Sequence, residues 1–336
     1  MDIQRELADT GSLGFDRSVS TNGYRWWYVD AFSDCGQYGM TLIFFIGSVF
    51  SPYYRAAWLR GDADPREFSC VNAIFYQPQS KWWTMTERRA SDLNVSASTL
   101  QIGPSSLSVD GNTITVDLDE RTAPFRRKLS GKVTLEMPSV TDRCYSLHSG
   151  GEHRWWPVAP VARATIQLDC PELAWCGTAY VDSNAGVVPL EQTFVDWHWS
   201  RAALANDQCR IVYEAHARDG ETCLLTLKGS TAEGMSPETS APRRDLPKGV
   251  VWQVGRPTRS HQGLEVVNTL EDTPFYTRSH LRGPSGDSVM HESLDLDRFK
   301  SRWVQTLLPF RIRKMRYGLA MSGNPGIPVS GVKRFE

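Results

Sequence analysis

The sequence lacks an excess of charge of either sign and lacks a long hydrophobic run. Its 336 residues carry 37 basic and 38 acidic side chains, a net charge of −1, which removes the usual electrostatic case for a nucleic-acid partner. The most apolar run, Met40 to Phe50, has 11 residues, whereas a helix needs about 20 to cross a bilayer. The first 15 residues contain no apolar segment typical of a signal peptide. We therefore expect a cytoplasmic chain that does not span a membrane.

The common motifs of cofactor and metal chemistry are also missing. The chain has no GxGxxG, GxxxxGK[ST], HExxH or GxSxG, the markers of dinucleotide sites, phosphate-binding loops, zinc proteases and α/β hydrolases. Its seven cysteines include no CxxC pair. We expect reduced, structural thiols in place of a disulfide framework, and no metal site.

Short runs rich in β-branched and aromatic residues recur between clusters of Gly, Asn, Asp and Pro, a pattern typical of strands joined by turns. Period-two alternation predicts a hairpin over 108–119 with its turn at 110–112, and a second hairpin over 211–228. The strongest helix signal, 295–308, can also be interpreted as a turn plus a strand. Further strands are expected at 23–30, 41–50, 133–137, 164–168 and 178–182. Many short strands with little helix predict an all-β barrel or sandwich and argue against Rossmann and TIM folds.

The chain length allows two domains or one large all-β domain, and we predict two. We expect an N-terminal segment at 1–20, a first domain at 21–192, a second domain at 193–321 and a loosely held tail at 322–336. Residues 229–248 concentrate Gly, Ser, Pro and charge and predict a long loop inside the second domain.

A basic stretch near the C-terminus allows two interpretations. It is either a solvated strand face or a contact for anionic lipid, which is worth only about 1 kcal/mol per charge. Its members are Arg311, Arg313, Lys314 and Arg316.

Tryptophan is abundant: there are 12, with doublets at 26–27, 82–83 and 155–156. In a strand, each doublet sends one indole to each face, so one ring can line an interior while its neighbour packs outside. Core filling explains any one of these rings, but together they predict a large aromatic cavity suited to an elongated hydrocarbon or a carbocation. His198 is either a base or a structural histidine between flanking indoles. The candidate substrate-binding residues are Trp27, Trp83, Trp197, His198 and Trp199.

Two short polar elements are candidates for a site: His153-Arg154-Trp155 and Tyr180-Val181-Asp182. If each lies on a strand, His153 and Trp155 share one face, as do Tyr180 and Asp182. The spacing leaves two interpretations open, namely convergence of the four side chains on one pocket, or a surface aspartate and an ordinary hydrogen-bonded histidine.

Five segments together resemble the carotenoid 1,2-hydratases, also called hydroxyneurosporene synthases, and the likeness covers most of the chain. The resemblance implies two tandem lipocalin-like antiparallel β-barrel domains. It also implies cofactor-free hydration of a terminal double bond in an acyclic carotenoid, and peripheral association with the inner or photosynthetic membrane of purple bacteria. The five segments are 23–54, 72–88, 153–160, 179–191 and 197–202.

In that family the H-x-W and Y-x-D elements are linked to catalysis, and they fall here on His153, Trp155, Tyr180 and Asp182. Asp182 is then the acid that protonates the alkene, because burial among aromatic rings keeps a carboxyl group protonated near neutral pH. Trp155 and Tyr180 stabilise the cation through their ring faces. His153 orients Asp182 or the attacking water and accepts its proton.

Two other functions fit the same sequence. One is a lipocalin-like cyclase or pericyclase that acts on a polyene or isoprenoid, and the other is a non-catalytic carrier of hydrophobic ligands. A carrier gains nothing from an unpaired buried carboxyl group, which costs several kcal/mol. The carboxyl group of Asp182 therefore favours an enzyme.

Overall fold

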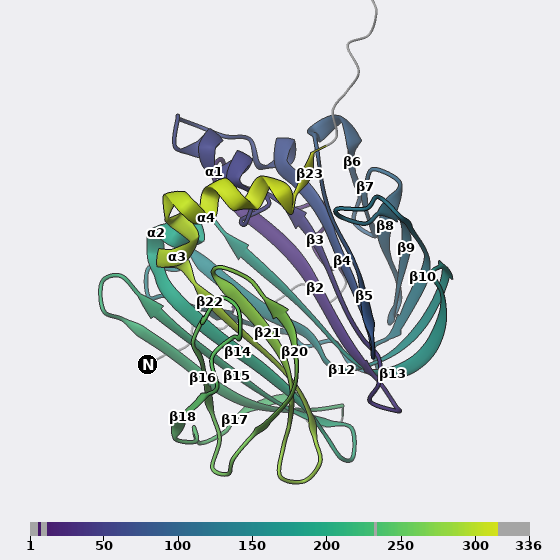
Figure 1. The fold of residues 1–336 in the computed structure, drawn as a ribbon, viewed down its shortest axis with the longest axis vertical. Helices are drawn as coiled ribbons and strands as arrows, with labels where there is room; N and C mark the ends of the chain where they lie inside the picture. The colour runs from purple at the N-terminus through teal and green to yellow at the C-terminus, as the bar shows by residue number, and fades with distance from the viewer. Residues whose placement is uncertain (1–5, 8–11, 232–233, 315–336) are drawn as a thin grey trace, which may run out of the picture.

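The computed structural model describes residues 6–7, 12–231 and 234–314, and strands dominate it, with little helix. The predicted all-β class is confirmed. Figure 1 shows a large curled sheet beside a smaller one, with the helices gathered at one end. The α-helices within the described residues are α1 (Pro52–Trp58), α2 (Leu190–Thr193), α3 (Leu296–Lys300) and α4 (Arg302–Leu307).

The large sheet has 14 strands, of which twelve follow the order β23-β5-β4-β3-β2-β13-β12-β10-β9-β8-β7-β6, while β11 pairs with β12 and β1 with β11. All of its pairs are antiparallel except β23 with β5. Its members are β1 (Glu6–Leu7), β2 (Tyr24–Ser33), β3 (Gly39–Ile46), β4 (Ser69–Gln77), β5 (Ser80–Arg88), β6 (Leu93–Val95), β7 (Thr99–Ile102), β8 (Ser105–Asp110), β9 (Thr113–Arg121), β10 (Lys128–Glu136), β11 (Arg143–Ser146), β12 (His153–Cys170), β13 (Glu172–Gly186) and β23 (Arg313–Lys314).

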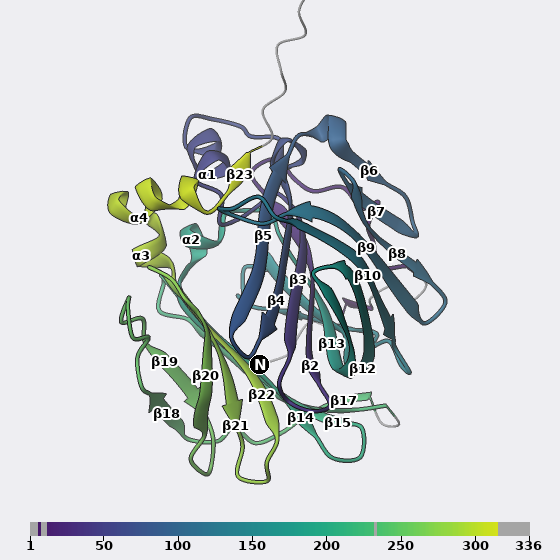
Figure 2. The ribbon, with the colours of Figure 1, turned by 45° about the vertical axis from the view of Figure 1, so that its right-hand side comes forward.

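The smaller sheet has seven strands in the order β17-β16-β15-β14-β22-β21-β20, and a two-stranded sheet joins β18 to β19. Figure 2 shows the two sheets from another side, and β19 contacts β14 and β22, so the β18–β19 hairpin lies over one face of the smaller sheet. These strands are β14 (Phe194–Leu204), β15 (Gln208–Ala217), β16 (Thr222–Ser230), β17 (Gly234–Pro237), β18 (Arg243–Leu246), β19 (Arg256–Arg259), β20 (Glu265–Asp272), β21 (Tyr276–Arg282) and β22 (Ser288–Asp295).

Both predicted hairpins are present, as β8–β9 and β15–β16. Their turns contain Gly111 and Gly220, whose φ angles of 55° and 94° favour glycine. The predicted helix at 295–308 forms as α3 and α4, separated at Ser301, whose ψ of 144° is extended. Asp295 caps α3 by accepting a hydrogen bond from the backbone of Arg298 (2.8 Å).

The prediction of one long loop at 229–248 is wrong in part, because β17 and β18 lie within it. Pairing with β16 and burial of Met235 hold β17, and burial of Leu246 anchors β18. Four-residue strands are too short for their alternation to stand out among Gly, Ser and Pro.

At β2 and β3 the large sheet is buried on both faces, which accounts for the continuous apolar run of β3. Alternate residues of β2 enter two different cores: Trp27 and Val29 pack inside the large sheet, whereas Trp26 and Tyr28 pack against the smaller sheet. Between the two sheets, Arg201 of β14 forms a fully buried ion pair with Asp30 of β2. The candidate site lies in this second core.

The chain passes from the large sheet to the smaller one at α2. The domain limits stay a prediction, and the predicted tail at 322–336 lies outside the described residues. Of the basic stretch, Arg316 also lies outside them, while the Arg311 guanidinium lies over the Trp83 ring (4.6 Å) and the Lys314 ammonium over Tyr53 (4.7 Å). Neither predicted interpretation of this stretch included such packing on aromatic rings.

Candidate active site

Three of the four predicted catalytic residues meet on two neighbouring strands. Trp155 of β12 is the register partner of Asn184 on β13, so it lies diagonally across from Asp182, within reach of a long side chain. The Trp155 indole donates a hydrogen bond to Asp182 Oδ2 (2.9 Å), and the Tyr180 hydroxyl donates to the same oxygen (3.0 Å). All three side chains are buried.

The Asp182 carboxyl group is tuned to hold a proton. Burial raises its pKa to about 8, and the negative charges of Glu292 and Asp30 add to this, although the two donors on Oδ2 oppose it. Its other oxygen, Oδ1, is buried and has no hydrogen-bond partner among the described residues. The acidic proton can therefore lie on Oδ1, where no hydrogen bond from the described residues opposes its transfer.

Aromatic rings surround this carboxyl group. The Tyr180 ring lies 5.3 Å from that of Trp199, and the Trp155 ring lies 5.2 Å from that of Tyr213. Ring faces attract positive charge. The surroundings of Asp182 therefore suit a cation formed by proton transfer to carbon.

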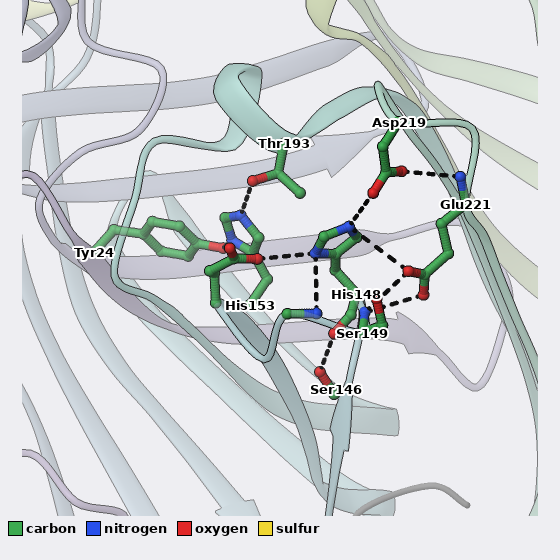
Figure 3. Close-up of polar contacts among 10 residues, drawn as sticks. Tyr24, Ser146, His148, Ser149, His153, Thr193, Asp219 and Glu221 are labelled. Carbon is green, nitrogen blue, oxygen red and sulfur yellow. Dashed lines mark hydrogen bonds and ion pairs between the residues drawn. The ribbon is translucent and has the colours of Figure 1, made fainter. Parts of the chain in front are cut away.

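His153 is held elsewhere in the same core. Its Nδ1 bonds the Tyr24 hydroxyl (2.9 Å) and its Nε2 the Thr193 hydroxyl (2.8 Å), as Figure 3 shows. Burial lowers the pKa of His153 to about 4, so the ring is neutral near pH 7. Because His153 pairs with Gly186, four residues beyond Asp182 on β13, its ring nitrogens bond these two hydroxyls and not the Asp182 carboxyl group.

A cavity of about 100 Å³ opens in the core between the two sheets. Tyr28 lines it and contacts the Tyr180 ring (6.3 Å) and the Trp199 ring (5.5 Å). Asp182 does not line it, so a layer of aromatic side chains separates the cavity from the acid. Its aromatic lining residues are Trp26, Tyr28, Phe45, Phe50, Trp83, Trp197, Phe275 and Tyr276.

The predicted substrate-binding residues are divided among several places. Trp83 and Trp197 line the cavity, and Trp199 packs between Tyr28 and Tyr180. Trp27 instead faces the core inside the large sheet, where its indole donates to the Leu13 carbonyl (2.9 Å). His198 projects from the opposite face of β14 and bonds Ser293 (2.9 Å).

Sequence reasoning missed Trp26, Tyr28, Arg278 and Glu292, which also line the cavity. The sequence did contain a signal for Glu292. This residue alternates with Met290 and Leu294 and so places a charge on an otherwise apolar strand face. Trp26 had none, since a doublet does not say which of its two rings faces a ligand.

Two groups of side chains bring possible metal ligands within 4.8 Å of one another: Asp196, His198 and His216, and His148, Asp219 and Glu221. Both groups are joined internally by hydrogen bonds or ion pairs. Neither includes a residue that bonds Asp182.

The fold itself is found in solved structures. An AttH-type protein from Nitrosomonas europaea aligns over 81% of this chain and 92% of its own, with 13% identity and a TM-score of 0.54. CghA aligns over 86% of this chain and 96% of its own, with 14% identity and a TM-score of 0.50. At these identities the likeness concerns the fold alone, which is lipocalin-like and built of two curled sheets.

Sequence comparison identifies the family. The family model described as carotenoid hydratase CrtC matches residues 42–319. The acyclic carotenoid 1,2-hydratases of Thiocapsa roseopersicina and Rubrivivax gelatinosus are each 41% identical over 90% of this chain, covering 75% and 76% of their own lengths. That of Rhodobacter capsulatus is 35% identical over 81% of this chain and 96% of its own. The chain belongs to the carotenoid hydratase family and is an enzyme of the hydro-lyase class.

Proposed function

We propose that this enzyme adds water, without a cofactor, to the terminal 1,2 double bond of an acyclic carotenoid of the neurosporene or lycopene type. Asp182 is the proton donor in this proposal, and the product is a tertiary alcohol. One observation carries it: a buried carboxyl group whose pKa is raised to about 8 keeps one oxygen free of hydrogen bonds, beside aromatic rings. Family membership supplies the substrate class.

The reaction starts with transfer of the Asp182 proton to C2 of the alkene, which leaves a tertiary cation at C1. A water oxygen then bonds to C1 and loses a proton. The rings of Trp155, Tyr180 and Trp199 stabilise the cation, and the two donors on Oδ2 stabilise the carboxylate that remains. Because Tyr28 lies between the cavity and Tyr180, the substrate end reaches Oδ1 when the Tyr28 ring turns aside.

His153 acts as a positioning residue in this proposal. Its two hydrogen bonds join β12 to Tyr24 on β2 and to Thr193 of α2, at the entry to the smaller sheet. A neutral ring held at both nitrogens fixes the end of β12 from which Trp155 reaches Asp182.

Asp182→Asn tests the proton donor. The amide keeps the shape but has no acidic proton, so hydration falls by about 10² to 10⁴, while the variant still binds carotenoid, measured by its visible absorption. Asp117→Asn, at an exposed position of β9, is the matched control and keeps the parent rate. A rate in Asp182→Asn above about a tenth of the parent's contradicts the proposal, since loss of a general acid costs at least about 10².

Turnover in ¹⁸O-water separates hydration from the other two functions. Label in the product identifies hydration, and an isomer of unchanged mass identifies a cyclase. Bound carotenoid that is returned unchanged identifies a carrier.

We also propose that the enzyme contacts the membrane through the end that carries α4. Trp303, Leu307 and Phe310 lie three or four residues apart on the outer side of α4 and the turn after it, and all three are exposed. Leu308 and Ile312, on the inner side, line the cavity. An apolar surface continuous with the cavity offers a carotenoid a path out of the bilayer.

A further inference from the structure

The cavity wall carries a carboxylate that no step above uses. Glu292 of β22 lies on the strand face that buries Met290 and Leu294, and its side chain is 13% exposed, toward the cavity. An ionised group at such a position costs free energy unless it is paired.

Glu292 is held firmly by two donors on one oxygen. Its Oε1 accepts hydrogen bonds from the Tyr28 hydroxyl (2.8 Å) and from Arg278 Nε (2.7 Å). Arg278 is itself buried and donates to the Tyr76 hydroxyl (2.9 Å), so its guanidinium is fixed and stabilises the negative charge of Glu292. Among the described residues no hydrogen bond reaches Oε2 of Glu292, and this oxygen can accept one from a water in the cavity.

Tyr28 connects this carboxylate to the acid. Its hydroxyl bonds Glu292, its ring packs on Tyr180, and its backbone is the register partner of Asp182. Glu292 is near enough for its charge to raise the pKa of Asp182. Tyr28 therefore links the surroundings of the two carboxyl groups.

We propose that Glu292 is the general base that takes the proton from the water that captures the cation. The inference rests on the proposed function. In this step the C1–O bond forms, one O–H bond of the water breaks, and its proton moves to Oε2 of Glu292. Asp182 has meanwhile given its proton to C2, and one proton passes from Glu292 back to Asp182 through solvent before the next turnover, so no proton is consumed.

The proposal assigns the two proton transfers to two different residues, and this division can be measured. Protonation of the alkene is reversible when no oxygen captures the cation, because the cation returns to an alkene by losing a proton from a neighbouring carbon. In D₂O this reversal places deuterium in the recovered substrate. An enzyme without its base thus exchanges hydrogen without hydrating.

The experiment incubates lycopene with the full-length enzyme in buffered D₂O and measures both the alcohol and the deuterium in recovered substrate by mass spectrometry. Glu292→Gln is expected to hydrate at least about 10²-fold more slowly while deuterium exchange continues at or above the parent rate. Asp182→Asn is expected to lose both. The matched control is Glu214→Gln, a buried, arginine-paired glutamate on the other face of the same sheet, which keeps the parent ratio of exchange to hydration.

Hydration above a tenth of the parent rate in Glu292→Gln overturns the assignment. The assignment is also overturned if Glu292→Gln folds and binds carotenoid but loses both hydration and deuterium exchange. That result would make Glu292 necessary for protonation of the alkene, and the proposed function would still stand. Exchange that persists in Asp182→Asn overturns the proposed proton donor instead. If Glu292→Gln does not fold, Glu292→Asp replaces it in the experiment. The shorter side chain keeps the charge beside Arg278 but moves its carboxylate oxygens away from the water. A ratio of exchange to hydration equal to the parent's then overturns the assignment.

Discussion

At the scale of single residues, the hydrogen bonds on Asp182 act against its burial. Burial raises the pKa of this carboxyl group, whereas the Trp155 and Tyr180 donors stabilise the carboxylate and lower it. An acid that returns to its protonated form in every turnover needs both effects. Burial holds the proton near neutral pH, and the donors lower the free energy of the carboxylate left after proton transfer.

Tyr180→Phe is therefore predicted to move the pH profile of kcat upward. In the proposed mechanism activity requires the protonated carboxyl group, so the parent is expected to lose activity as pH rises through about 8. Loss of one donor to a charged group is worth about 1.5 to 3 kcal/mol, which raises the pKa by roughly one to two units. The decline then comes at higher pH, and the plateau below it falls because the carboxylate is less stable.

Initial rates between pH 5 and 10 measure this effect. Tyr54→Phe is the control, since the Tyr54 hydroxyl bonds the Gly23 carbonyl (2.6 Å) and does not touch Asp182. A Tyr180→Phe profile that declines at or below the parent's pH contradicts the assigned hydrogen bond.

At the scale of elements, local sequence predicted the hairpins but not every strand. The turns at Gly111 and Gly220 carry their own conformational signal, as does the Asp295 cap of α3. The β17 strand has no such signal, because pairing with β16 and burial of Met235 hold it in place. Its structure is set by distant contacts that a window of sequence does not contain.

The tryptophan doublets show a second limit. Alternation correctly predicted that each pair divides between two faces, as Trp26 and Trp27 do. It does not tell which face meets the ligand, because β2 is buried on both of its faces. The sequence therefore indicated Trp27, whereas the structure places Trp26 at the cavity.

One contact between the two sheets is expected to depend on pH. His148, in the loop between β11 and β12, bonds Glu152 beside it (2.8 Å) and Asp219 in the β15–β16 turn (3.0 Å), as Figure 3 shows. Burial favours the neutral ring, but the hydrogen bonds to Asp219 and Glu152 outweigh it and raise the pKa of His148. The stabilisation is then complete below the ordinary pKa of about 6.5 and is lost as pH rises through the raised value.

His148→Gln should thus lower the free energy of unfolding at pH 5.5 and have little effect at pH 9. The expected difference is about 1 kcal/mol or less, because Asp219 is exposed. Urea unfolding at the two pH values measures it, with His261→Gln at an exposed position as control. An equal loss at both pH values shows that charge on His148 does not contribute.

At the scale of the whole molecule, the site depends on the packing of two sheets. Asp182 and Glu292 are more than 100 residues apart, and the core between the sheets, with its Asp30–Arg201 pair, brings them near each other. Family resemblance led to Trp155, Tyr180 and Asp182, which meet as expected. It did not lead to Glu292, because two residues that meet across separate sheets have no fixed separation in the sequence.

The route of substrate entry is also a property of the whole molecule. Among the described residues no helix has the length and hydrophobicity to cross a bilayer. On the outer side of α4 and the turn after it, the exposed apolar residues are Trp303, 47% exposed, Leu307 and Phe310, 81% exposed. The exposed Arg302 lies next to Trp303 in the chain, and the exposed Arg126 lines the same surface hollow as Phe310. Aromatic rings with basic neighbours suit the surface of an anionic bilayer.

Replacing Trp303, Leu307 and Phe310 together by Ser is predicted to weaken binding to anionic phospholipid vesicles at least tenfold. Full burial of one such side chain is worth about 1.5 to 3 kcal/mol, so even partial burial of three exceeds the 1.4 kcal/mol of a tenfold change. Flotation with vesicles measures binding, and Val267→Ser, exposed on β20, is the control. The variant should hydrate detergent-dispersed carotenoid at the parent rate but vesicle-bound carotenoid more slowly. Equal vesicle binding by variant and parent would place the membrane contact on another face, and an equal loss of both activities would mean that the substitutions damage the site itself.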